Sequence, residues 1–156
     1  MQIHLLCIGN RMPDWVSSAY DDYAKRLPAH CRLNCIEIPA MKRPQHADLA
    51  KITQTEGDAL LANIPKGAYC IALDEKGQHW STKEVSQQLT RWQALGCDVA
   101  LLVGGPDGLS DAVRVRAQQT WSLSALTFPH PLVRVILAEQ LYRACSLLSG
   151  HPYHRA

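Results

Sequence analysis

The residues best suited to hold a small ligand form a glycine-rich turn, GGPDG, at residues 104–108. The turn follows an apolar run at residues 99–103 and precedes Ser110, a residue type that often begins a helix. Because glycine has no Cβ, a ligand can closely approach the backbone N–H and C=O groups of such a turn. Ligands of α/β proteins commonly bind where a buried strand ends in this way. The pattern therefore predicts a binding site, although an ordinary tight turn explains the same residues.

The turn does not match the common nucleotide-binding signatures, so a ligand site here needs a second segment. It lacks the G-x-G-x-x-G spacing of dinucleotide-binding proteins and the lysine and hydroxyl residue of a P-loop. Residues 124–131 suit this purpose, because Pro129 and Pro131 fix two φ angles and favour extended backbone at the preceding residues. Such a rigid loop can present backbone groups to an adenine edge or a carboxylate. Alternatively, the prolines only direct the chain into the last helix.

Aromatic and basic side chains are concentrated in the segment HPYHR at residues 151–155. These side chains can stack on a nucleobase and contact phosphate. The segment is therefore either an arm that binds substrate or a solvated chain end. A metal site is disfavoured, because His151 and His154 have no evident third ligand.

Two other groups of side chains carry weaker signals. Lys42 and Arg43 suit phosphate contact, but residues 39–46 around them contain two prolines and are more simply explained as a solvated loop. Cys145 lies within an apolar helix and Cys97 beside the start of a strand, so neither is expected to be an exposed thiolate. With no G-x-S-x-G motif either, covalent catalysis is not expected.

Length and composition predict one domain over residues 1–156. The net charge of +2 neither requires nor excludes an RNA partner, so any attraction to nucleic acid must come from a local patch. The six cysteines include no C-x-x-C pair, and no export leader or membrane-spanning run is evident. These features predict a reduced, cytoplasmic protein.

Short apolar runs alternate with segments of helical periodicity, which predicts an α/β fold with a mostly parallel sheet and helices on both faces. The runs expected to form strands are residues 3–8, 33–38, 68–73, 99–103 and 121–126. The segments expected to form the main helices are residues 13–27, 47–64, 81–95 and 131–149. Ser81 and Glu84 have the spacing of a capping box.

The last helix is apolar around most of its circumference, with Glu139, Arg143 and Ser146 forming only a narrow polar stripe. Such a helix needs neighbours on two sides, and in a small domain the second neighbour can be another subunit. The pattern therefore predicts a homodimer, while complete burial within one subunit explains it equally well.

Several motifs together resemble the RlmH family of bacterial SPOUT methyltransferases, and the similarity runs from end to end. The motifs are LD at residues 73–74, LVGGPDGL at residues 102–109, SLSALTFPHPLVRVILAEQLYRA at residues 122–144 and HPYHR at residues 151–155. Further matches are MPDW at residues 12–15 and IEIPA at residues 36–40.

This resemblance implies a homodimer that binds S-adenosylmethionine in a C-terminal trefoil knot. It also implies methylation at N3 of a pseudouridine in an exposed stem-loop of the large-subunit (23S) ribosomal RNA, on the assembled ribosome. The cofactor-binding residues implied are Leu73, Gly104, Gly105, Ser124, Ala125, Leu126, Thr127, Phe128 and Pro129. Asp107 stands where many members of the family have glutamate, which preserves the carboxylate.

The catalytic residues that the resemblance implies are His154, Tyr153, Arg155 and Glu139. Substrate-binding residues would be Arg134, Arg143 and the same three tail residues. Methyl transfer from a sulfonium requires no metal, so the protein must position the reactants and remove the N3 proton. His154 or Glu139 would accept that proton, and Arg143 or Arg155 would favour the resulting anion. Two alternatives are a non-catalytic module that binds RNA or the ribosome with the same fold, and a metabolite-binding α/β domain without an RNA partner.

Overall fold

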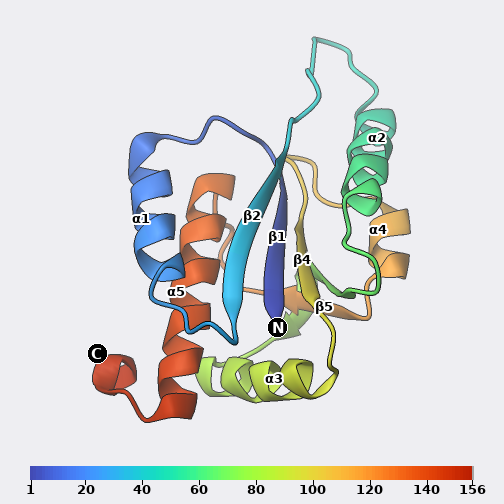
Figure 1. The fold of residues 1–156 in the computed structure, drawn as a ribbon. Coiled ribbons are helices and arrows are strands. Elements are labelled where there is room, and N and C mark those ends of the chain that lie inside the picture. Colours follow the sequence, from blue (N-terminus) through green and yellow to red (C-terminus); the bar gives the residue numbers. More distant parts are fainter. Residues whose placement is uncertain (156) are drawn as a thin grey trace.

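A computed structural model describes residues 1–155 and contains one five-stranded sheet (Figure 1). All neighbouring strands are parallel, in the order β2-β1-β4-β3-β5. The strands are β1 (Gln2–Ile8), β2 (Arg32–Ile38), β3 (Tyr69–His79), β4 (Val99–Val103) and β5 (Gln119–Ser122). The predicted parallel α/β sheet is confirmed.

Helices cover both faces of this sheet (Figure 1). The helix α5 packs against α1 and α3 on one face, while α2 and α4 contact each other on the opposite face. The helices are α1 (Asp14–Ala24), α2 (Leu49–Ala62), α3 (Thr82–Ala94), α4 (Asp111–Arg116) and α5 (His130–Ser149), followed by the short 3₁₀ helix η1 (Pro152–Arg155). None of the helices within residues 1–155 is long and apolar enough to cross a membrane.

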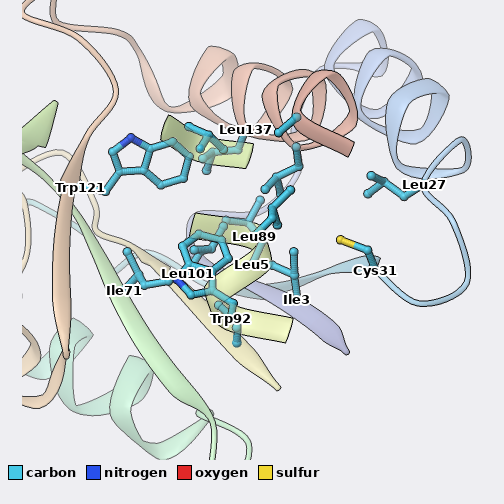
Figure 2. Packing of buried hydrophobic residues seen from close by; sticks show 14 of the residues in the cluster. Ile3, Leu5, Leu27, Cys31, Ile71, Leu89, Trp92, Leu101, Trp121 and Leu137 are labelled. Atoms are coloured by element: carbon cyan, nitrogen blue, oxygen red, sulfur yellow. The ribbon is translucent and has the colours of Figure 1, made fainter. Parts of the chain in front are cut away.

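Alternate side chains of the central strands enter two hydrophobic clusters. Ile3 and Leu5 of β1 pack with Trp92 and Leu137 under α3 and α5 (Figure 2). Leu6, the residue after Leu5, belongs to the cluster on the opposite face of the sheet. Because side chains of a strand alternate between faces, a central parallel strand needs apolar residues throughout. This requirement explains why β4, VALLV, is completely buried.

The helix boundaries largely follow the capping signals of the sequence. The hydroxyl of Ser81 accepts a hydrogen bond from the backbone N–H of Glu84, as the capping pattern predicts. The carboxylate of Asp48 caps α2 in the same way, so this helix begins two residues later than expected. Gly150 ends α5 with a left-handed φ of 74°.

The prediction for the last strand was wrong, because β5 ends at Ser122 and residues 123–129 leave the sheet. The hydroxyl of Ser124 accepts a bond from Leu126 N, which turns the chain locally instead of extending it. Strand β3 is longer than expected and pairs with β5 a second time after a register shift. Gly77 permits this pairing, since a Cβ there would lie 2.7 Å from Trp121 N.

Candidate functional site

The glycine turn and the loop after β5 line the same pocket, at the carboxyl ends of β4 and β5 and beside the middle of β3. The pocket has a volume of about 170 Å³ and joins a wider hollow that shares its Asp74 and Phe128 walls. Of the cofactor-binding residues expected from the sequence, seven line the pocket itself, Pro129 lines the adjoining hollow, and Ala125 lines neither. Those seven are Leu73, Gly104, Gly105, Ser124, Leu126, Thr127 and Phe128.

Backbone geometry makes glycine necessary in this turn. Gly108 N donates to Gly105 O at 3.0 Å, and Gly108 has a φ of +82°. A Cβ on Gly104 would lie only 2.6 Å from Gly108 O, so the two backbone segments approach too closely for any side chain. The turn therefore exposes main-chain groups to the pocket without a covering side chain.

The wall of the pocket opposite the glycine turn contains groups suited to a ligand with both apolar and polar parts. Phe128 is half-buried beside the pocket, and the side chain of Leu126 is 71% exposed at its rim. His130 begins α5, and its Nδ1 atom is buried without a hydrogen-bond partner among residues 1–155. A buried polar atom without a partner is costly, so a ligand in this pocket could stabilise it.

A carboxylate held by two donors lies at the pocket rim. Asp74 Oδ2 accepts from Arg114 Nε at 2.6 Å, and Asp74 Oδ1 accepts from Lys76 N at 3.0 Å. Burial acts to raise the pKa of Asp74, but these two hydrogen bonds and the charge of Arg114 outweigh it and lower the pKa. The ionised carboxylate is suited to face a cationic part of a ligand. Sequence reasoning missed Arg114, since no signal in the sequence pairs it with Asp74.

The loop carrying Arg43 is not simply solvated, contrary to the interpretation that the sequence favoured. Arg43 Nη2 lies 2.8 Å from Glu56 Oε1, and Arg43 Nε lies 2.7 Å from Asp107 Oδ2 in the glycine turn. The two carboxylates raise the pKa of Arg43. Glu56 is 3% exposed. The sequence does not predict this burial, because a charged residue in an amphipathic helix is usually exposed. Lys42, by contrast, is exposed.

Arg134, expected to bind substrate, lies inside the protein. Its side chain is 5% exposed, with Nη1 donating to Glu37 Oε2 and Nη2 donating to Gly9 O, both at 2.7 Å. Nη1 also lies 3.8 Å from Cys35 Sγ. These contacts hold the first turns of α5 against the ends of β1 and β2.

One tail residue, Tyr153, joins a cluster around Glu139 on α5. Tyr153 OH donates to Glu139 Oε1 at 3.2 Å, and Arg143 Nε donates to the same oxygen at 2.7 Å. The ring of Tyr153 lies 4.6 Å from that of Tyr142, and the guanidinium of Arg143 lies 5.0 Å from the Tyr153 ring. Desolvation, with the neighbouring Tyr23 and Glu139, raises the pKa of Tyr153. His154 is half-buried and Arg155 is exposed.

Within one chain, the pocket lies at the start of α5, and the tail cluster lies further along the helix, around Glu139. His130, at the start of the helix, lines the pocket, while η1 follows its far end (Figure 1). Glu139 is nine residues beyond His130, roughly 13 Å along the axis of a regular helix. The structure therefore brings together two sets of predicted residues but does not join them in one site.

Cys145 is buried and has the inert character that the sequence suggests for it. Its Sγ lies 3.7 Å from Cys31 Sγ, and that contact together with burial raises the pKa of Cys145. A buried thiol with a raised pKa is a poor nucleophile. No group of three histidine, cysteine, aspartate or glutamate side chains in the part of the chain that the structure describes converges as a metal site would require.

The fold agrees with comparisons to known proteins. The chain belongs to the SPOUT methyltransferase family, whose model, described as "Predicted SPOUT methyltransferase", matches residues 1–154. The resemblance found in the sequence is thereby confirmed. Among solved structures, a probable methylase family protein from Haemophilus influenzae aligns with a TM-score of 0.58 at 12% identity, covering 97% of this chain and 69% of that one, which shows a similar fold alone.

Among curated proteins, the chain is similar to several that share one name, Ribosomal RNA large subunit methyltransferase H. The protein from Thioalkalivibrio sulfidiphilus is 63% identical over 155 residues, with 99% of each chain covered. Those from Methylococcus capsulatus and Hahella chejuensis are each 55% identical over 155 residues, again with at least 99% of each chain covered.

Proposed function

We propose that this chain transfers a methyl group from S-adenosylmethionine to N3 of a pseudouridine in large-subunit ribosomal RNA, on the assembled ribosome. The observation that carries the proposal is the pocket in which the turn at residues 104–108 meets the loop at residues 123–129. Support for the RNA substrate comes from the name shared by relatives up to 63% identical to this chain. Action on ribosomes would place the protein in the cytoplasm. The proposed enzyme would consist of a single domain.

The residues of the pocket fit S-adenosylmethionine. When bound, this cofactor supplies an activated methyl group on a sulfonium. Leu73, Leu126 and Phe128 offer apolar surface to the adenine, and the exposed backbone of Gly104 and Gly105 offers hydrogen-bonding groups. The ionised Asp74 at the rim suits the positive charge of the donor.

A knotted chain path would account for how this pocket is built. After β5 at one edge of the sheet, the chain passes the middle of β3 and the carboxyl end of β4, and α5 starts near the end of β1. The bond from Arg134 to Gly9 O fixes this crossing. We include the trefoil knot in the proposal because such a crossing brings the loop at residues 123–129 and the glycine turn to the same pocket.

In a homodimer, the tail of one subunit would lie at the pocket of the other. The tail cluster around Glu139 lies at a distance from the pocket of its own chain, so a single subunit lacks a complete site. Apolar side chains that could cover a partner remain exposed, including Trp15 at 55%, Leu132 at 37% and Leu148 at 48%. We propose that the pocket of one subunit works with the tail of its partner.

The chemistry required of the protein is removal of the N3 proton and stabilisation of the anion that remains. The oxygens of Glu139 already accept from Tyr153, Arg143 and Gln140, which occupies this carboxylate. His154 is therefore the better proton acceptor. If the imidazole of His154 accepts the N3 proton, N3 would keep the electron pair with which it attacks an activated methyl group, and the bound donor would supply that group. Arg143 and Arg155 would stabilise the deprotonated base, and Tyr153 would stack on it.

The proposal is tested with ribosomes from cells that lack this methylation. The purified protein is incubated with these ribosomes and labelled S-adenosylmethionine, and the labelled nucleotide is mapped by mass spectrometry. We expect one labelled methyl group at N3 of a pseudouridine of the large-subunit RNA. Label on another nucleotide, or on none, would contradict the proposal.

The same experiment separates the two alternative functions. A non-catalytic module of this fold would bind ribosomes without transferring label. A metabolite-binding domain would bind the cofactor and ignore ribosomes. The basic and aromatic tail, with Tyr153, His154 and Arg155, favours an RNA-directed activity over the second alternative.

A further inference from the structure

Arg43 connects the loop after β2 to the glycine turn through a buried ion pair. Its Nη1 and Nη2 atoms donate to Glu56 at 3.0 and 2.8 Å, in the two-point geometry that a guanidinium forms with a carboxylate. Nη1 also donates to Met41 O, and Met41 N donates to Glu56 Oε2. These bonds fix the direction of the remaining donor, Nε, which meets Asp107 Oδ2 at 2.7 Å.

The glycine turn rests directly on this ion pair. A Cβ on Gly105 would lie 2.8 Å from Glu56 Oε1 and 3.2 Å from Arg43 Nη2, so the backbone is in close contact with both charged groups. Asp107 is in the same turn, between Pro106 and Gly108. The turn is therefore held in two ways: Gly105 packs against the ion pair, and Asp107 accepts a charge-assisted hydrogen bond from Arg43.

We propose that Arg43 is a positioning residue of the methyl-donor pocket, acting through Asp107 to hold the turn at residues 104–108 in its ligand-binding conformation. This inference rests on the proposed function. Arg43 does not line the pocket, so its effect reaches the donor only through the turn. Preorganising a backbone site reduces the free energy that binding must spend on ordering it.

The test removes the connection without removing the buried ion pair. Arg43→Ala would leave the buried carboxylate of Glu56 without its positively charged partner and could prevent folding. Asp107→Asn instead weakens only the link between Arg43 and the turn, and Asp107→Glu keeps the carboxylate. Lys42→Met is the matched control, because it removes a neighbouring exposed positive charge.

Binding of S-adenosylmethionine to each full-length variant is measured by isothermal titration calorimetry, and melting temperature is measured in parallel. Asp107→Asn should raise the Kd about tenfold, equivalent to about 1.4 kcal/mol, with a change in Tm below about 2 °C. Asp107→Glu and Lys42→Met should bind as the unchanged protein does. Equal binding by Asp107→Asn and the unchanged protein would overturn the positioning role and leave the proposed function intact.

A double-mutant cycle distinguishes positioning from direct contact of Asp107 with the donor. Arg43→Lys keeps the charge opposite Glu56 but cannot bridge two carboxylates with a planar fork. If Arg43 acts through Asp107, the double variant should bind no more weakly than the weaker single variant. Additive losses would overturn the inference. Failure of the unchanged protein to bind S-adenosylmethionine would overturn the proposed cofactor and, with it, this role.

Discussion

The hydroxyl of Tyr153 lies 3.2 Å from Glu139 Oε1, so the C-terminal tail is folded onto the last helix of its own chain. The same carboxylate oxygen accepts from Arg143, which also contacts the Tyr153 ring. Three residues that the sequence assigns to RNA chemistry thus form one cluster, at a distance from the pocket assigned to the methyl donor. This separation underlies the predictions that concern activity.

Removal of residues 153–156 should abolish methylation of ribosomes while leaving the Kd for S-adenosylmethionine within about twofold. None of the tail residues that the structure describes, 153–155, lines the pocket. Calorimetry and a labelled-methyl assay on the same preparation measure the two properties. Methylation at the unchanged rate would remove the tail from the mechanism.

Gly104→Ala should weaken donor binding at least tenfold and destabilise the protein by about 1–3 kcal/mol. The added Cβ would lie 2.6 Å from Gly108 O, so the turn must open to accommodate it. Gly67→Ala is a control for adding a methyl group, because nothing lies within 4 Å of its Cβ position, although its φ of +77° also imposes backbone strain. Donor binding by Gly104→Ala equal to that of this control would show that the turn does not take part in binding the donor.

Arg134→Ala should act on stability, with a loss of about 3 kcal/mol in the free energy of unfolding. Arg134 is 5% exposed, and its removal leaves Glu37 and the Gly9 carbonyl without their donor. Urea denaturation measures the change. A variant of unchanged stability that fails only in RNA binding would instead support the substrate-binding role expected from the sequence.

Stability should depend on Asp98 in acid. Hydrogen bonds from His4 and from Gln2 N lower the pKa of Asp98 below its ordinary value of 3.8. A lowered pKa in the folded state means that the stabilisation is complete above the unfolded value and is lost as pH falls through the folded value. Between pH 6 and pH 2, the unchanged protein should therefore lose more stability than Asp98→Asn. Denaturant titrations at the two pH values measure the free energy of unfolding of both proteins. If both lose the same amount of stability, the pKa of Asp98 is not lowered by folding.

The parallel sheet and the two walls of the pocket could be predicted from the sequence because local patterns determine them. The run VALLV at β4 predicts a strand buried on both faces. Gly104 and Gly108 follow it, at the place where two backbone segments come close together. The prolines before α5 likewise predict an extended segment. In each case, the residue types of one short segment are enough to predict its backbone conformation.

Other features could not be predicted, because they depend on pairs of residues distant in sequence. Nothing in the helix α2 distinguishes buried Glu56 from a solvated glutamate until Arg43 is placed opposite it. Arg134 looks like a surface cation, yet the crossing of α5 places it against the end of β1. The end of β5 was misplaced because Leu123 and Leu126 are apolar, like the residues of a buried strand, but line the pocket.

The central claim is that an active site combines the pocket of one subunit with the tail of another. It is tested most directly by mixed dimers of two inactive chains, one carrying Gly104→Val and the other lacking residues 153–156. Each mixed dimer would contain one intact pocket facing one intact tail, so labelled-methyl transfer should return to about half the activity of the unchanged dimer. Mixed dimers as inactive as their parents would contradict the composite site.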